Sequence, residues 1–356
     1  MLSFRQKPEY YHWLNIIFVI CLALLAYGTT LGHSFVWDDF YLIVDNDFVK
    51  SWDNIHLLFK NDYLTPLNKL DYTGEMFIGS GELSYRPVST LSHFVEYHFW
   101  KLNPFGYHLT NMILHTINAI LVYAFVCLLR QPKRISLLTS VLFAIHPVNS
   151  EVVNVISFRE DLLVVFFGLL ALIAYLFLCE NRKYNFWIYC SSMVFYFLAL
   201  FSKEMAITIP FLMLLSRYYV KQEKLSKESF WPHIKKYGGG YIILTLFYLW
   251  VWAFPMARNT DLMINYFDGN VLVRIMTMTK VIGVYLVWLC FPVDIHATIS
   301  DYSFVVRSIS DPYFLTAAFS IICLTLFVYQ WRQLMAFLCF ATLWFWITLL
   351  PVLNIK

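Results

Sequence analysis

The stretch YHLTNMILHTINAILVY, residues 107–123, is mostly apolar and carries four polar side chains at helical spacing. They recur at i, i+3, i+7 and i+10, which is one face of a helix. These residues are His108, Asn111, His115 and Asn118. A helix that is apolar outside this stripe suits a lipid bilayer, so the stripe must face protein or water. Hydrogen bonding between helices is the simplest interpretation, and a metal site is the alternative, for which this spacing is weak.

Similar apolar runs recur along the whole chain. Its 356 residues are 60% hydrophobic and 14% charged, with a mean hydropathy of +0.60, well beyond what a soluble core needs. The sequence therefore predicts an all-α polytopic helical bundle, with about 9–11 transmembrane helices in a single membrane-embedded domain over 1–356. The predicted spans are 13–31, 106–129, 135–150, 161–179, 186–201, 205–220, 239–256, 274–291, 312–329 and 334–351.

Charge between the spans predicts their orientation. Basic segments mark cytoplasmic loops. These segments are 130–134, 181–185, 221–238 and 329–333. The first loop, 32–105, then lies outside, and within 31–84 nine Asp and Glu face three Lys. To keep 329–333 inside, we expect 274–291 to be a re-entrant or interfacial helix within a second outer region, 257–311.

The first outer loop contains a further predicted helix at 86–103. It starts with Pro87 and ends before Asn103-Pro104, as a helix bounded at both ends would. Its aromatic content suits the membrane interface, so we expect it to lie on the outer surface with His93 and Glu96 as surface residues.

Two adjacent carboxylates, Asp38 and Asp39, follow the first span. The simple interpretation is loop structure or helix capping, since Asp is common in loops. The functional interpretation is a carboxylate base, because basic side chains suited to a phosphate stand at other outer ends. These are Arg86, Arg159 and Lys203.

Further polar residues accompany these cations. Around Arg159, a short solvated loop and a pocket in which carboxylates orient the guanidinium are equally open interpretations. Lys203 and Glu204 form either a self-compensating ion pair at a loop tip or a functional site in which Lys203 faces an anion. The residues expected to line or orient the pocket are His108, Asn111, His146, Glu151, Glu160, Asp161 and Glu204.

Several motifs, taken together and in order, carry a resemblance. They are SFVWDD (34–39), YRPVSTLS (85–92), NPFGYHLTNMILHTINAILVY (103–123), LFAIHPVNSEVVNVISFREDLL (142–163), FSKEMAITIPFLMLL (201–215), DYSF (301–304) and LLPVLN (349–354). The chain resembles the membrane part of the transmembrane and tetratricopeptide-repeat O-mannosyltransferases and their bacterial relatives. That family belongs to the C superfamily of lipid-phosphosugar glycosyltransferases, which also holds the protein O-mannosyltransferases.

The resemblance implies an inverting transfer of a sugar, most often mannose, from a polyprenyl-phosphate donor such as dolichyl-phosphate mannose. The acceptor would be a hydroxyl of a protein Ser/Thr or a glycan, on the lumenal side of the endoplasmic reticulum or the periplasmic side of a bacterial inner membrane. Asp38 would be the general base with Asp39 beside it or as the alternative. Arg86, Arg159 and Lys203 would hold the donor phosphate, and Glu204 would orient Lys203. No obligatory cofactor, no metal and no nucleic-acid partner are expected.

Two departures from the family pattern stand out. The chain reads HPVNSE at 146–151 where eukaryotic members read HPVHTE, so a second histidine is absent. The sequence ends at LLPVLNIK, where the family continues into repeats, so we expect a relative truncated before the repeats or lacking them. A transporter or lipid-sugar flippase is the alternative function, and a non-catalytic assembly subunit is a third.

Overall fold

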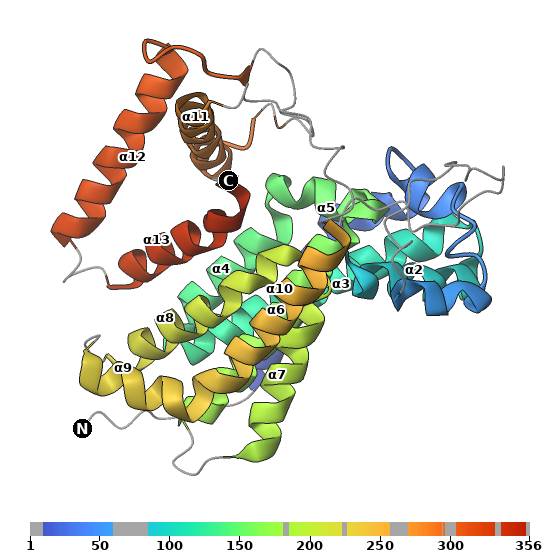
Figure 1. The fold of residues 1–356 in the computed structure, drawn as a ribbon, viewed down its shortest axis with the longest axis horizontal. Helices are drawn as coiled ribbons and strands as arrows, with labels where there is room; N and C mark the ends of the chain where they lie inside the picture. The colour runs from blue at the N-terminus through green and yellow to red at the C-terminus, as the bar shows by residue number, and fades with distance from the viewer. Residues whose placement is uncertain are drawn as a thin grey trace. The chain divides into compact units, whose positions relative to one another are not determined.

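The computed structural model describes residues 10–59, 85–180, 185–222, 226–256, 270–293, 295, 304–331 and 336–353. Within these ranges the chain is helical and contains no strand. The predicted all-α helical bundle is therefore confirmed (Figure 1).

The chain divides into two compact units, formed by residues 1–206 with 230–256 and by residues 207–229 with 257–356. The first unit holds α1 Tyr10–Tyr27, α2 Pro87–Trp100, α3 Pro104–Leu128, α4 Lys133–Ile145, α5 Ser150–Asn154, α6 Arg159–Glu180, α7 Phe186–Leu200 and α10 Gly239–Met256. The second holds α8 Ile209–Lys221, α11 Val271–Cys290, α12 Pro312–Trp331 and α13 Ala336–Leu349, and the short α9 Lys227–His233 spans the boundary. The single domain expected over 1–356 stays a prediction.

Five helices in the described part of the chain are long and apolar enough to cross a membrane. They cover His12–Gly32, Pro104–Leu128, Ile156–Glu180, Val271–Cys290 and Pro312–Trp331. A sixth span results if Lys133–Ile145 and Pro147–Asn154, which meet at 46°, count as one broken helix. The predicted membrane protein is thus supported, whereas the higher number of 9–11 spans stays a prediction.

The helix α11 covers most of the segment 274–291, which we expected to be re-entrant or interfacial. It is one continuous 20-residue helix, capped by Asn270, whose side chain accepts hydrogen bonds from the backbone N–H of Leu272 (2.9 Å) and Val273 (3.4 Å). This helix is long and apolar enough to cross a membrane, and the re-entrant or interfacial placement stays a prediction. The rest of the outer region 257–311 lies partly outside the described residues.

In the first unit, α3 packs against α1, α4 and α6 (Figure 1). Small side chains make the closest approach possible, because Ala23, Ala119 and Ala144 from three different helices meet with Val19 in one buried cluster. Asn103 begins α3 by accepting a hydrogen bond from the Phe105 N–H at 3.2 Å, ahead of the proline at the first helical position.

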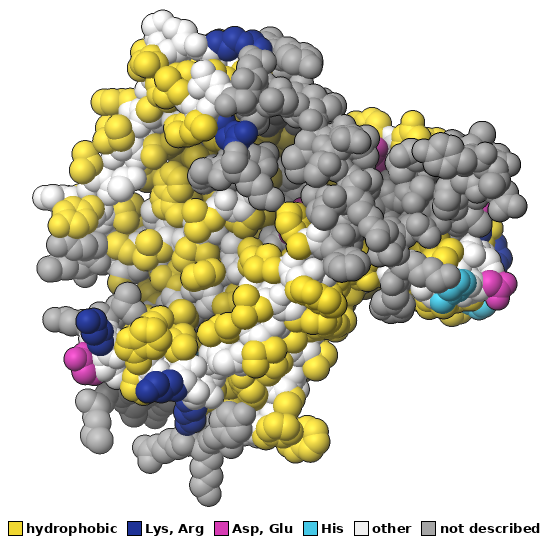
Figure 2. All heavy atoms as spheres, in the orientation of Figure 1, with side chains coloured by type: hydrophobic (Ala, Val, Ile, Leu, Met, Phe, Trp, Pro, Cys, Tyr) yellow, Lys and Arg dark blue, Asp and Glu magenta, His cyan; other side chains and the backbone are white. Residues whose placement is uncertain are grey.

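Apolar side chains cover much of the surface. Figure 2 shows them spread along the helices, with several Lys and Arg near α9 and a few others in the upper part of the view. On α1 the exposed large side chains include Trp13, Ile17, Phe18 and Leu25. An apolar surface of this extent is typical of contact with lipid rather than water.

Candidate active site

The turn that carries Asp38 is held by a pair of hydrogen bonds. The Asp39 N–H donates to the Val36 carbonyl at 3.0 Å, and the Val36 N–H donates to Asp39 Oδ2 at 3.0 Å. Between them Trp37 has φ 48°, a left-handed conformation that is unfavourable for a bulky residue and is typical of functional sites. The turn leaves Trp37 and Asp38 exposed at its tip.

The neighbouring carboxylate has a different environment. Asp39 is fully buried, and its Oδ1 accepts a hydrogen bond from the Ser157 N–H at 2.7 Å. Both oxygens of Asp39 are therefore bound to backbone N–H groups, which suits an anchor. This anchor joins the turn to the start of α6, where Arg159, Glu160 and Asp161 follow within about 6 Å of helix length.

Arg159 is fully buried, and its guanidinium binds four groups. The Nε donates to Asn111 Oδ1 at 2.8 Å and Nη2 donates to the Tyr107 carbonyl at 3.0 Å. The Nη1 donates to Glu96 Oε2 and to Ser92 Oγ, the latter at 3.4 Å. Arg159 thus holds α2, α3 and α6 together, and its partner is Glu96 rather than the expected Glu151, Glu160 or Asp161.

The predicted surface position of His93 and Glu96 is wrong. Both are buried, with His93 Nδ1 at 3.9 Å from Glu96 Oε2. The exposed residues of α2 are instead mostly apolar, namely Leu91, Val95, Phe99 and Trp100, with His98 as the polar one. The helix therefore has its polar face inside and its apolar face outside, the reverse of a helix in water. The predicted helix itself, 86–103, is confirmed as α2.

Burial and charge shift the pKa values of this pair. Burial lowers the pKa of His93, which keeps the ring neutral, although Glu96 opposes the shift. Burial alone would raise the pKa of Glu96, but the charge and hydrogen bond of Arg159, together with the interaction with His93, outweigh burial, so the carboxyl pKa lies below its usual value. Glu96 and Arg159 therefore form a charged buried pair.

A second cluster of charges lies at the same end of α6. Arg86 donates from Nη1 to Glu160 Oε1 at 2.9 Å and from Nη2 to Glu204 Oε1 at 2.8 Å. Lys203 pairs with Asp161 and lies 3.5 Å from Glu160 Oε1. The side chains of Arg86 and Lys203 are 20% and 18% exposed, so both cations are accessible from outside the protein.

Two expectations about this cluster are corrected. Lys203 and Glu204 do not compensate each other at a loop tip, since each pairs with a different element. Glu204 orients Arg86 rather than Lys203, with a second contact from Arg86 Nε at 3.2 Å. Burial would raise the pKa of Glu204, but the hydrogen bonds and charge of Arg86 outweigh it, so the pKa is lowered.

The remaining predicted pocket residues lie around these two clusters. Glu151 is half-buried in α5, close enough to Asp161 and Lys203 for electrostatic interaction. His146 caps the bend after α4, where its Nδ1 accepts from the Val148 N–H at 3.2 Å. His108 is buried, with its ring centroid 6.1 Å from that of His33, close to the Asp39 turn.

The polar stripe of α3 forms hydrogen bonds between helices, as expected. Asn111 donates to the carbonyls of Val153 and Val155, and Asn118 donates to Leu162 at 2.9 Å. In the described ranges no three His, Cys, Asp or Glu side chains come together in a metal-binding arrangement.

The fold and this arrangement define a polytopic helical membrane protein in which the turn with the exposed Asp38 is anchored to Ser157, and two partly exposed cations pair with carboxylates at the start of α6. Curated relatives of the chain are named as protein O-mannosyl-transferases, from Caenorhabditis elegans (32% identical), Xenopus laevis (34%) and Homo sapiens (30%). These similarities support the transmembrane and tetratricopeptide-repeat O-mannosyltransferase family to which the motifs point.

The three alignments cover 55%, 48% and 45% of this chain, in the same order. They cover 27%, 20% and 17% of the relatives, so the matched part is a minor share of each relative's length. No family model and no solved structure matches the chain.

Proposed function

We propose that the chain is a glycosyltransferase that moves a sugar, most often mannose, from a polyprenyl-phosphate donor to a hydroxyl group of a protein or glycan. The observation that carries the proposal is the Asp39 anchor, which holds the exposed Asp38 beside the charged start of α6. The names of the relatives as protein O-mannosyl-transferases support a protein acceptor and mannose.

In this mechanism Asp38 is the general base. It takes the proton of the acceptor hydroxyl as that oxygen attacks the anomeric carbon from the face opposite the phosphate. The bond between the anomeric carbon and the phosphate oxygen breaks, and the polyprenyl phosphate leaves with the bonding electrons. Inversion follows because attack and departure occur on opposite faces.

Arg86 and Lys203 stabilise the negative charge of the departing phosphate. Their partial exposure supports this role, and their carboxylate partners hold them in place until the donor binds. Arg159, which we also expected at the phosphate, fits a positioning role better, because its buried guanidinium already binds four groups. Arg159 fixes the start of α6 and thereby the next two residues, Glu160 and Asp161, which pair with Arg86 and Lys203.

The chemistry needs no obligatory metal or cofactor, since a carboxylate base and two cations supply proton removal and charge stabilisation. We place the site on the lumenal side of the endoplasmic reticulum membrane or the periplasmic side of a bacterial inner membrane. The basic segments 130–134 and 221–238 support this placement, because positive loops face the cytoplasm.

Sugar transfer in detergent tests the proposal. The purified chain is mixed with radiolabelled dolichyl-phosphate mannose and a Ser/Thr-rich peptide, and the labelled peptide is counted. Transfer is expected without any membrane gradient. A transporter or flippase would instead move the lipid-linked sugar across a vesicle bilayer and leave the peptide unlabelled, and that pair of results would overturn the proposal.

A further inference from the structure

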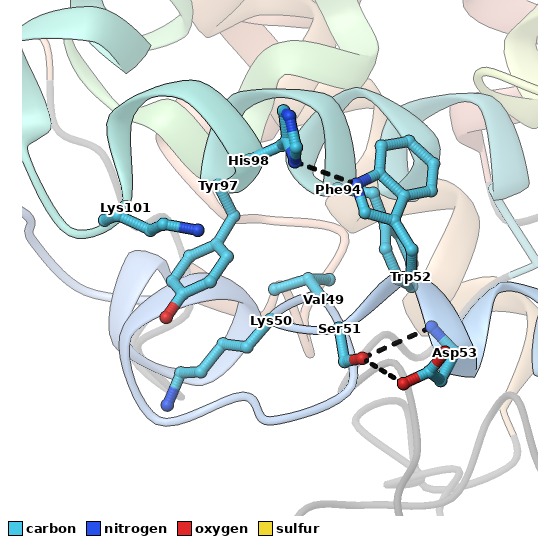
Figure 3. A pocket seen from close by; sticks show the side chains of 9 residues that line it. All are labelled: Val49, Lys50, Ser51, Trp52, Asp53, Phe94, Tyr97, His98 and Lys101. Carbon is cyan, nitrogen blue, oxygen red and sulfur yellow. Dashed lines mark hydrogen bonds between the residues drawn. The ribbon is translucent and has the colours of Figure 1, made fainter.

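A small cavity lies between α2 and the 3-10 helix η3 Trp52–Phe59, away from the charges described above. Its volume is about 260 Å³. Figure 3 shows Trp52 and Tyr97 on opposite sides of it, with Val49 between them. The volume is below the roughly 300–1,000 Å³ of pockets for drug-sized ligands, so it suits a molecule of about one ring.

The walls of this cavity are aromatic and held in place. Phe94 packs against one side of the Trp52 ring, with centroids 5.7 Å apart, and Trp52 remains 41% exposed. The indole Nε1 donates to His98 Nδ1 at 3.3 Å. An indole N–H only donates, so the His98 ring nitrogen is the acceptor of this contact. The ring of Trp52 is thus fixed as a flat, partly open surface.

The charges around the cavity balance. Lys50 and Lys101 lie on the Tyr97 side and Asp53 on the Trp52 side (Figure 3). Lys50 is paired with Asp47 at 2.8 Å, and the Lys101 ammonium lies 5.0 Å from the centroid of the Tyr97 ring. Among the charged side chains that the structure describes at this cavity, Lys101 therefore stands against one carboxylate, Asp53. Because one positive and one negative side chain lie at the rim of the cavity, the rim favours a neutral polar ligand over an anion.

We propose that this cavity binds a neutral hexopyranose ring. The C–H face of such a ring carries partial positive charge and packs on the electron-rich face of an indole, here Trp52. Its hydroxyl groups both donate and accept, so Asp53 and Ser51 accept from them while Lys101 donates. Ser51 Oγ already holds Asp53 Oδ2 at 3.1 Å, which orients the carboxylate.

The role of the site rests on the proposed function. Helix α2 presents Glu96 to Arg159 and the next residue, Tyr97, to the cavity. A sugar bound here would be one that the acceptor already carries. Its binding would hold that glycosylated segment of the acceptor against α2, the helix that also supports the transfer site. The cavity is therefore an acceptor-sugar subsite, separate from the donor phosphate.

Saturation-transfer NMR tests binding with the full chain in a detergent that has no sugar head group. The probe is methyl α-D-mannopyranoside, with a dissociation constant expected on the order of millimolar. Trp52→Ala is expected to weaken binding at least about tenfold, equivalent to the loss of one aromatic stacking contact. Asp53→Asn, an exposed change that keeps the shape, is expected to weaken it about threefold or more. Trp187→Ala, which removes a 77% exposed tryptophan on α7 outside the cavity, is the matched control and should bind normally.

No binding by the wild-type chain, displacement of the sugar by inorganic phosphate, or normal binding by both Trp52→Ala and Asp53→Asn overturns the proposal. The measurement does not depend on catalysis, so it separates this site from the proposed function. An inactive chain that still binds the sugar supports the cavity and contradicts only the transferase. An active chain that binds no sugar contradicts only the cavity.

Discussion

Replacing Glu96 by Gln tests whether the buried pair with Arg159 supports the fold. Arg159 is fully buried and Glu96 is 5% exposed, so the substitution leaves the guanidinium charge without a compensating charge away from water. Breaking a buried pair by removing one partner costs about 3–5 kcal/mol. We expect the lower end of that range, because Gln still offers an oxygen to Arg159 Nη1.

The chain contains a matched control for this change. Arg130 and Glu180 form an ion pair of 3.4 Å whose side chains are 66% and 36% exposed, so Glu180→Gln should cost about 0–1 kcal/mol. Thermal unfolding of both variants in the same detergent, followed by intrinsic fluorescence, gives the comparison. An unfolding midpoint for Glu96→Gln no lower than that of Glu180→Gln would refute the structural role of the pair.

Three further outcomes are expected. Gly106→Ala should destabilise the chain by about 1–3 kcal/mol, because a Cβ there would lie 2.2 Å from Trp100 Cγ, whereas Gly28→Ala, with open space around it, should be neutral in the same thermal assay. Because the pKa of His93 is lowered in the folded chain, the unfolded chain binds more protons just below pH 6.5. The free energy of unfolding should therefore fall as the pH decreases through 6.5, by up to about 1.4 kcal/mol per pH unit. His93→Gln should flatten the pH dependence of the thermal unfolding midpoint. Lys203→Gln should lower kcat for sugar transfer about 10–100-fold, since it removes a charged contact to the leaving phosphate, and an unchanged kcat would remove the lysine from the mechanism.

Helical periodicity predicted much of the fold. The spacing of polar residues in 107–123 indicated both the helix α3 and its buried face, and Pro87 marked the start of α2. The same logic failed for His93 and Glu96, because their polar face was read as facing water although the structure places it inside. The helical spacing of Ser89, His93 and Glu96, opposite the apolar Leu91, Val95 and Phe99, was the signal that could have shown this.

The partners of the charged residues could not be predicted from spacing. Glu96 lies 63 positions from Arg159, and Arg86 lies 118 positions from Glu204. Such pairs depend on how the helices pack, which a single sequence does not encode in any local pattern. The sequence did predict which residue types surround the proposed site. It did not predict that Asp39 is buried as an anchor while Asp38 is exposed, because that difference also depends on packing.

The rate of sugar transfer by Asp38→Asn tests the central claim most directly. The variant keeps the shape of an exposed side chain, so its unfolding midpoint should equal that of the wild type, and Asp45→Asn, another exposed Asp nearby, serves as the control. Loss of the base predicts transfer slowed by about 10²–10⁴-fold in Asp38→Asn and normal transfer in Asp45→Asn. Transfer by Asp38→Asn at the wild-type rate would contradict the account.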